Sequence, residues 1–118
     1  MKTYEKHLFE PWFSLIKIGK KNVEGRINKG DFAIMEKGDI IIFQNNDFGF
    51  MRKIMVEITE TRFYNSFKEY LTCESLANCL PPIDTIEEGE CIYYNFYKKE
   101  DEISFGVKAF QLVLIEDL

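Results

Sequence analysis

Apolar and polar positions in the middle of the chain follow a pattern that predicts a β-hairpin. Every residue from 40 to 43 is apolar, as in a strand that is covered on both faces. Within residues 51–59, every second position from Ile54 to Ile58 is apolar, which is the period of a half-buried strand. The connecting residues 45–49 read Asn-Asn-Asp-Phe-Gly, a sequence that favours a tight turn.

A first helix is predicted over residues 11–18. Pro11 suits the first helical position, because its missing N–H would have no partner there, and Gly19 can adopt the left-handed conformation that ends a helix. Trp12 lies on the apolar face of this helix, which we expect to enter the core.

Two further helices are predicted in the second half of the chain. One covers residues 66–78, and the other runs from a cap at Asp84 or Thr85 to about residue 97. The aromatic residues of the second helix cannot all face one way, so some must line a groove or the surface: Tyr93, Tyr94, Phe96 and Tyr97.

Strands are also predicted over residues 22–27 and 107–114. The resulting order of helix, strands, two helices and strand indicates a mixed α+β domain, and a small barrel is the natural closure for strands this short. We expect residues 1–118 to form one such domain.

The composition predicts a folded protein that needs no metal or other cofactor. The chain is 46% hydrophobic and contains 11 Phe, 6 Tyr and one Trp, which is enough to bury a core. Its three cysteines form no CxxC pair and only one histidine accompanies them, so we expect reduced thiols and no zinc site. We find no signal-peptide pattern and no apolar stretch near the roughly 18 residues that span a bilayer. We therefore expect an intracellular protein, cytoplasmic or nuclear, without a membrane segment.

The charge distribution indicates one local contact with an anion. The net charge is −5, which argues against broad binding to nucleic acid. Residues 1–30 nevertheless hold seven Lys/Arg against three Glu, whereas residues 31–118 hold eight against seventeen Asp/Glu. A solvated lysine-rich segment is the alternative interpretation.

Polar side chains at alternate positions of the 22–27 strand share one face: Asn22, Glu24 and Arg26. Lys20 and Lys21 stand just before that strand. Arg26 can hold a phosphate with two hydrogen bonds or stack on a base, a lysine supplies a positive charge, and Glu24 can accept from a base N–H. The alternative is an ordinary ion pair between Glu24 and Arg26 on an exposed strand, worth roughly 0–1 kcal/mol.

Aromatic side chains are candidates for stacking on a base, which is worth roughly 1–3 kcal/mol per base. We expect one or two of three tyrosines in the last predicted helix to stack in this way, namely Tyr93, Tyr94 and Tyr97, and packing of this helix onto the barrel is the alternative role. Trp12 is expected in the core, with stacking as its alternative role.

Residues 10–26 resemble the signature of the ASCH (activating signal cointegrator homology) family. Glu-Pro-Trp at 10–12 is followed by a short amphipathic helix, by Gly-Lys-Lys at 19–21 and by Glu-Gly-Arg at 24–26. Later features, such as the aromatic segment 63–70, also fall where the family has them. The resemblance implies a PUA-like β-barrel of about five to six short strands with flanking helices, and a cleft between barrel and helices that takes RNA or a nucleotide-like ligand.

The resemblance also implies an enzymatic alternative. Some relatives are ribonucleases, and one small bacterial group is an amidohydrolase that acts on acetylated cytidine with a Lys, a Thr and a Glu. The Lys falls at Lys21, but the Thr falls at Glu24, and the Glu falls in the region of Glu69 and Glu74. A hydrolase would use Lys21 and Glu24 as its central pair, although Glu24 would stabilise the ammonium form of Lys21.

Together these observations predict a binding module that recognises a short single-stranded RNA, one nucleotide or one modified base, with a small footprint. The expected ligand-binding residues are Trp12, Lys20, Lys21, Glu24, Arg26, Tyr94 and Tyr97. A third alternative is a module that binds a basic protein through an acidic surface, for which a solvated helix face is the simpler explanation: Glu87, Glu88, Glu90, Glu100, Asp101 and Glu102.

Overall fold

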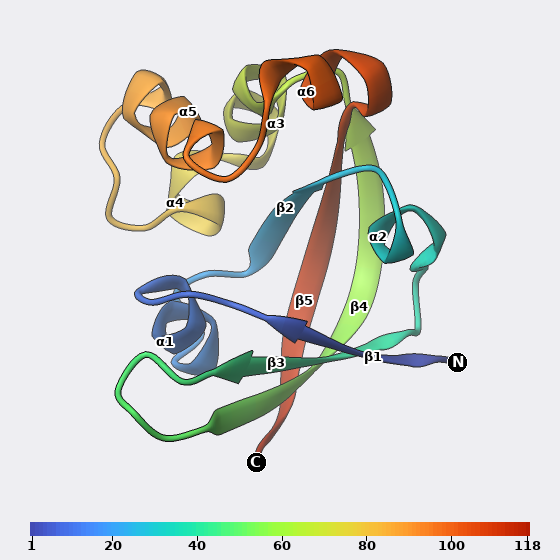
Figure 1. Ribbon diagram of the computed structural model, residues 1–118, viewed down its shortest axis with the longest axis vertical. Coiled ribbons are helices and arrows are strands. Elements are labelled where there is room, and N and C mark those ends of the chain that lie inside the picture. The colour runs from blue at the N-terminus through green and yellow to red at the C-terminus, as the bar shows by residue number, and fades with distance from the viewer.

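The computed structural model describes residues 1–118 as a mixed α+β domain built on one curled sheet (Figure 1). The sheet has five strands in the order β1-β3-β4-β5-β2 and curls into a half-barrel. This agrees with the predicted α+β domain built on a small barrel of about five to six strands. β1 pairs with β3 in parallel, and the other neighbours are antiparallel. The strands are β1 (Thr3–His7), β2 (Val23–Ile27), β3 (Ile40–Asn45), β4 (Arg52–Tyr64) and β5 (Val107–Asp117).

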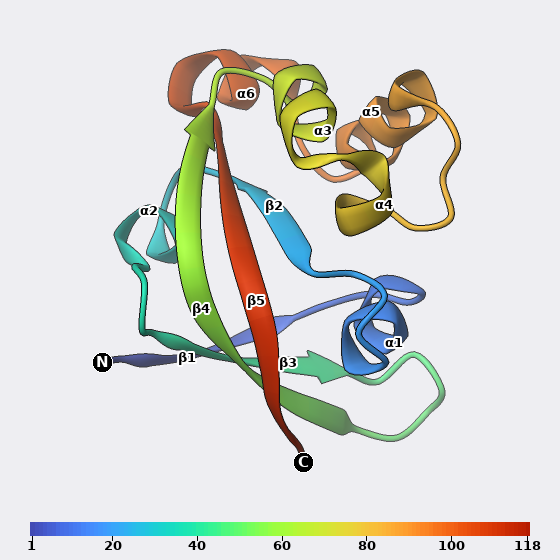
Figure 2. The same ribbon diagram turned by 180° about the vertical axis from the view of Figure 1, so that it is seen from behind.

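Six helices surround the sheet: α1 (Trp12–Lys17), α2 (Asp31–Ile34), α3 (Phe67–Glu74), α4 (Leu76–Cys79), α5 (Ile86–Tyr94) and α6 (Lys99–Phe105). Both ribbon views show α3 to α6 gathered at one end of the sheet, while α1 lies near the β3–β4 hairpin (Figures 1 and 2). None of the six helices has the length and apolar character needed to cross a membrane.

The predicted hairpin is confirmed, but its second strand is longer than predicted. β3 and β4 pair antiparallel, with Ile41 opposite Val56. β4 runs to Tyr64, beyond the predicted end at Thr59, because it continues to pair with β5 after an irregularity that follows Ile58. The added residues include charged ones, so the apolar alternation that marks the first half of the strand is lost there.

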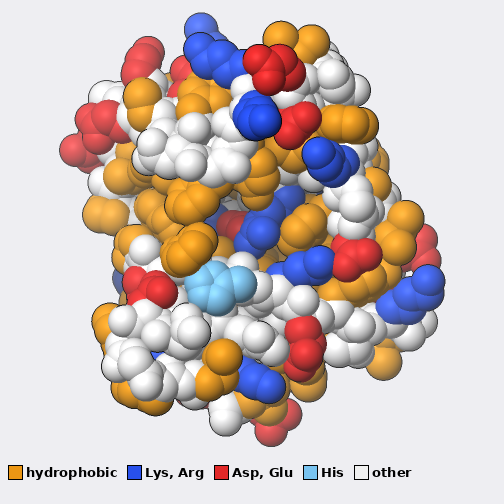
Figure 3. All heavy atoms as spheres, viewed as in Figure 1, with side chains coloured by type: hydrophobic (Ala, Val, Ile, Leu, Met, Phe, Trp, Pro, Cys, Tyr) orange, Lys and Arg blue, Asp and Glu red, His pale blue; other side chains and the backbone are white.

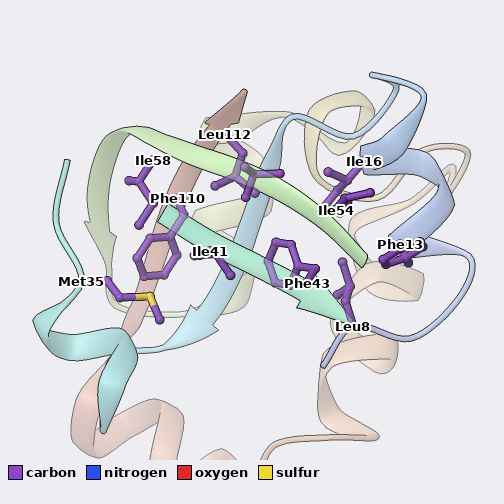
Figure 4. Close-up of a cluster of buried hydrophobic side chains, with 11 residues drawn as sticks. Leu8, Phe13, Ile16, Met35, Ile41, Phe43, Ile54, Ile58, Phe110 and Leu112 are labelled. Atoms are coloured by element: carbon purple, nitrogen blue, oxygen red, sulfur yellow. The ribbon is translucent and has the colours of Figure 1, made fainter. Parts of the chain in front are cut away.

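Two hydrophobic clusters hold the domain together. The first lies inside the curl of the sheet and reaches α1 (Figure 4): Leu8, Phe13, Ile16, Met35, Ile41, Phe43, Ile54, Val56, Ile58, Phe110 and Leu112. The second packs the helices against β2 and β5: Val23, Ile27, Phe67, Tyr70, Leu71, Cys79, Leu80, Tyr93, Val107 and Ala109. Trp12 is partly buried and packs against both clusters, so it connects the barrel interior with the helical layer.

Three short elements, β1, α2 and α6, were not predicted. Exposed and half-buried side chains alternate along β1, α2 buries no side chain, and α6 buries only Glu102. Their positions depend on tertiary contacts that no local pattern reports. For example, the buried Lys108 of β5 holds α2 by donating to the carbonyl oxygens of Phe32 and Ala33. Carbonyl groups near the C-terminal end of a helix have no partner within the helix, so they are free to accept this bond.

The helix predicted over residues 66–78 is instead two helices, because Ser75 adopts a positive φ of 83° between α3 and α4. The predicted cap of the next helix is confirmed at Thr85, whose side chain accepts from the backbone N–H of Glu88 at 3.1 Å. This helix, α5, ends at Tyr94, three residues before the predicted end.

Candidate ligand-binding cavity

A cavity of about 430 Å³ lies between the sheet and the helical layer. One wall comes from β2 and the end of β1, and the opposite wall comes from α5 and the residues that follow it. Figure 3 shows a hollow in the middle of this face, bordered by hydrophobic side chains and with basic and acidic side chains at its base. The lining residues are His7, Leu8, Phe9, Trp12, Lys21, Glu24, Gly25, Arg26, Leu80, Ile92, Tyr93, Phe96 and Tyr97.

Three charged residues, called here the charged triad, contribute the ionic part of the lining: Lys21, Glu24 and Arg26. Glu24 and Arg26 occupy alternate positions of β2, so their side chains leave the same face of the strand. The Glu24 carboxylate lies 3.1 Å from Lys21 Nζ and 2.7 Å from Arg26 Nε. Two cations and one carboxylate leave one net positive charge in a mostly apolar cavity, which favours a ligand with an anionic or hydrogen-bond-accepting group.

Lys21 is fixed by the protein itself. Its side chain is only 1% exposed. Nζ donates to the carbonyl oxygen of Val23 at 2.7 Å and to that of Cys79, and it also lies against Glu24. An ammonium group has three hydrogens, and these partners account for all of them. Lys21 therefore joins β2 to α4 and contributes charge to the cavity without a free donor.

Arg26 is the cation of the triad that retains free hydrogen-bond donors. Its Nε donates to Glu24, and its Nη2 donates to the carbonyl oxygen of His7 at 3.3 Å. The second bond joins β2 to β1, the two edge strands of the sheet. A guanidinium has five N–H donors, and contacts with Glu24, His7 and Tyr97 do not use all of them, so Arg26 can also donate to a ligand.

Glu24 and Arg26 keep their charges at neutral pH. Burial raises the pKa of Glu24, but attraction to Lys21 and Arg26 outweighs burial and holds this pKa below its ordinary value of 4.5. Burial lowers the pKa of Arg26, and the Glu24 carboxylate outweighs this effect, so the pKa of Arg26 is raised. Burial is also the main reason that the pKa of Tyr97 is raised, which keeps its phenol neutral.

Aromatic packing determines the shape of the helical wall. Phe67 of α3 stacks on Tyr93 with 4.3 Å between ring centres and on Tyr97 with 5.6 Å. Across from them, Gly25 allows the ring of Tyr70 to approach β2, since a Cβ at position 25 would lie 2.5 Å from a Tyr70 ring atom. The missing side chain at Gly25 therefore sets how closely the helical layer approaches the strand.

Five of the seven predicted ligand-binding residues line the cavity: Trp12, Lys21, Glu24, Arg26 and Tyr97. Lys20 does not line it and is exposed, and the exposed Asn22 also lies outside its lining. Tyr94 does not line it either, because its hydroxyl is directed toward α6 and donates to Glu102 at 2.8 Å. The other rings of the aromatic run, Tyr93 and Phe96, are the ones that join Tyr97 in the cavity.

The sequence did not indicate the contribution of residues 7–9 to the cavity. These residues belong to the end of β1 and the connection to α1, and β1 was not predicted, so nothing placed them opposite α5. Leu80 and Ile92 were missed for the same reason, because their proximity to β2 arises only when the helical layer packs on the sheet.

The other carboxylates considered from the sequence lie outside the cavity. Glu74 forms an ion pair with Arg62, and neither Glu74 nor Glu69 lines the cavity. Glu102 was expected on an acidic surface, which is wrong, since it is 5% exposed and accepts from the backbone N–H of Phe67 at 2.7 Å. No group of three or more His, Cys, Asp or Glu residues is arranged to hold a metal ion.

Comparisons with known proteins identify related chains. The family model described as the ASCH domain matches residues 7–116. The crystal structure of hypothetical protein PH0355 is 39% identical, with a TM-score of 0.87 over 98% of this chain and 100% of that chain. The solution structure of protein PF0455 from Pyrococcus furiosus is 36% identical, with a TM-score of 0.79 over 97% of this chain and 98% of that chain. No curated protein gives a significant match.

Proposed function

The chain belongs to the ASCH domain family, and from this premise we propose that it binds one unpaired nucleotide of RNA, or a nucleotide-like ligand, in the cavity between β2 and α5. The family is PUA-like and is thought to bind RNA. The observation that carries the proposal is the combination of aromatic walls with a charged triad that bears one net positive charge.

The size and lining of the cavity suit a single nucleotide. Its volume of about 430 Å³ lies within the roughly 300–1,000 Å³ that small-ligand sites occupy. Trp12 and Tyr97, which are only partly buried, offer ring surfaces for a base, and each stacking contact of this kind is worth roughly 1–3 kcal/mol. Proteins that recognise RNA bases usually bind unpaired bases that stack on aromatic side chains, so we take the ligand to be a free nucleotide or an unpaired residue of a strand.

The polar contacts come from the triad. Arg26 donates through its remaining N–H groups to a phosphate or a base carbonyl, while Glu24 accepts from a base N–H with the lone pairs that its two ion pairs leave free. Lys21 acts by charge alone, because its donors are already bound. Only one phosphate is neutralised, so the slope of log K against log salt is expected to be about −0.7.

The hydrolase alternative has less support from the geometry. A lysine that acts as base or nucleophile must lose a proton. The two carbonyl oxygens and the carboxylate around Lys21 Nζ all stabilise its ammonium form. The arrangement therefore favours binding over catalysis by Lys21.

A backbone-amide NMR titration tests the proposal, with nucleosides, ribonucleoside monophosphates, acetylated cytidine and short single-stranded RNA as probes. We expect shifts at residues 7–9, at β2 and at the C-terminal half of α5. Arg26→Lys should weaken binding by about 10- to 150-fold, because lysine keeps the positive charge but loses the guanidinium donor to the ligand, a charge-assisted hydrogen bond worth about 1.5–3 kcal/mol.

Arg62→Lys provides the matched control. Arg62 also holds a glutamate through its guanidinium, but it lies outside the cavity, so this variant should bind as the unchanged protein does. The proposal is wrong if no probe shifts the cavity residues at millimolar concentration, or if both arginine variants weaken binding equally. Appearance of product from acetylated cytidine would instead support the hydrolase.

A further inference from the structure

Two exposed phenylalanines meet across the cavity. Phe9 follows β1 on the sheet side, and Phe96 follows α5 on the helix side. Their ring centres are 5.5 Å apart and their planes differ by 22°, which is an offset stack. Of the aromatic contacts in the structure, it is the pair that joins one wall of the cavity to the other.

About half of each side chain remains accessible to water, although the two rings stack on each other. Phe9 is 48% exposed and Phe96 is 54% exposed. Burial in the core therefore does not explain these two side chains, whereas exposed apolar groups beside a cavity are typical of a binding site. Their common feature is that each lines the same cavity as the charged triad.

The contact can open without breaking the backbone structure around it. The carbonyl oxygen of Phe9 accepts from the N–H of Phe13, and the N–H of Phe96 donates to the carbonyl oxygen of Tyr93. Rotation of either side chain leaves these hydrogen bonds in place. Opening the pair costs the contact between the two rings and, where Phe9 rotates, its edge contact with the His7 ring at 4.5 Å, and a planar ligand can replace these with two ring contacts of its own.

We propose that Phe9 and Phe96 form an aromatic clamp, which is closed in the free protein by the stacking of the two rings on each other and which opens to stack on the base of the bound nucleotide. The inference rests on the proposed function, which supplies the nucleotide. In the free state the two rings stack on each other, and at 5.5 Å they leave no room for a base between them. A bound base separates them, and each ring then packs on the base.

The clamp adds a requirement that the charged triad does not impose. The triad would accept any small anion, whereas two ring faces select an anion that carries a planar aromatic group. Ribose phosphate should therefore bind far more weakly than a nucleotide with the same phosphate. This difference is the specificity that Phe9 and Phe96 contribute.

Calorimetry with ribonucleoside monophosphates measures the stacking role. Phe9→Ala and Phe96→Ala should each weaken binding by about 5- to 150-fold, the range that corresponds to loss of one base-stacking contact. Phe96→Leu keeps an apolar side chain without the ring and should also weaken binding. Phe50→Ala is the matched control, because Phe50 is exposed to a similar extent, 58%, and does not line the cavity.

Fluorescence quenching in the absence of ligand measures the closed state independently. Trp12 is the single tryptophan of the chain and lines the cavity, so its quenching by acrylamide reports access to the cavity. Phe9→Ala and Phe96→Ala should increase this quenching, while Phe50→Ala should leave it unchanged. The thermal transition of each variant verifies that it is folded.

The two measurements separate the clamp from the proposed function. If the unchanged protein binds no nucleotide, the proposed function fails and the stacking role fails with it, whereas quenching still decides whether the stacked pair limits access to Trp12. If nucleotides bind and the alanine variants match the Phe50→Ala control in affinity, the stacking role is refuted. Unchanged quenching refutes the closed state.

Discussion

Glu24→Gln is the substitution that tests most directly how the charged triad holds the domain together. Glutamine preserves the size of the side chain and removes its negative charge. Glu24 is 6% exposed, and it is the counter-charge of both Lys21 and Arg26. The substitution therefore leaves two largely buried cations facing each other without a carboxylate between them.

The loss of stability follows from this geometry. Removal of one partner from a buried ion pair costs about 3–5 kcal/mol. Lys21 keeps its two carbonyl partners and the new amide oxygen can still accept from Arg26. We therefore expect the free energy of unfolding to fall by about 3 kcal/mol, the lower end of this range. At roughly 4 °C per kcal/mol for a domain of this size, the melting temperature should fall by about 12 °C.

Urea unfolding followed by circular dichroism measures this loss at neutral pH and in acid. The pKa of Glu24 is lowered in the folded state, so its contribution is full above the ordinary pKa of 4.5 and is lost as the pH falls through the folded pKa. The difference between the two proteins should therefore shrink below about pH 4.5. Glu60→Gln removes an exposed glutamate paired with Lys37 and should cost less than about 0.5 kcal/mol.

A loss from Glu24→Gln as small as that of the Glu60→Gln control would refute the reasoning, because it would mean that water screens the triad. A loss that stays constant in acid would refute the charge explanation and leave only packing.

Two further substitutions test contacts between α3 and the sheet. Gly25→Ala should destabilise the domain by about 1–3 kcal/mol, since the new Cβ would lie 2.5 Å from a ring atom of Tyr70, and urea unfolding measures the loss. A neutral result would show that the ring can move away freely. Burial and the Glu74 carboxylate raise the pKa of Tyr64 to about 12, so Glu74→Gln should lower it toward its ordinary value of 10.0 in an ultraviolet absorbance titration. An unchanged pKa of Tyr64 would assign the effect to burial alone.

The parts of the fold that the sequence predicted are those in which local chemistry and tertiary structure agree. The β3–β4 hairpin has its apolar period and its turn residues, and α5 has the Thr85 cap. β1 and α6 have no such local signal, because their side chains are mostly exposed and their positions depend on contacts with distant segments. The break at Ser75 was missed because serine does not usually mark a positive φ.

The candidate site shows the same division between local and tertiary information. The period of a strand correctly placed Glu24 and Arg26 on one face of β2. The sequence could not decide between Lys20 and Lys21, since both precede the strand. In the structure the backbone N–H groups of both lysines donate to the carbonyl oxygen of Leu15, and only Lys21 lines the cavity. The meeting of Phe9 with Phe96 requires the packing of the whole helical layer.

The excess of basic residues in the first part of the chain does not form a positive surface for a long polyanion. Several of these residues pair with acidic residues: Lys6 with Asp31, Lys17 with Asp117 and Lys29 with Asp101. The positive charge that faces the cavity comes from the triad, where Glu24 cancels one of two cations. Electrostatic attraction is therefore limited to one anionic group at one place, and the remaining affinity must come from the aromatic walls. For this reason the geometry favours recognition of a single nucleotide over a contact that follows the phosphates of a strand.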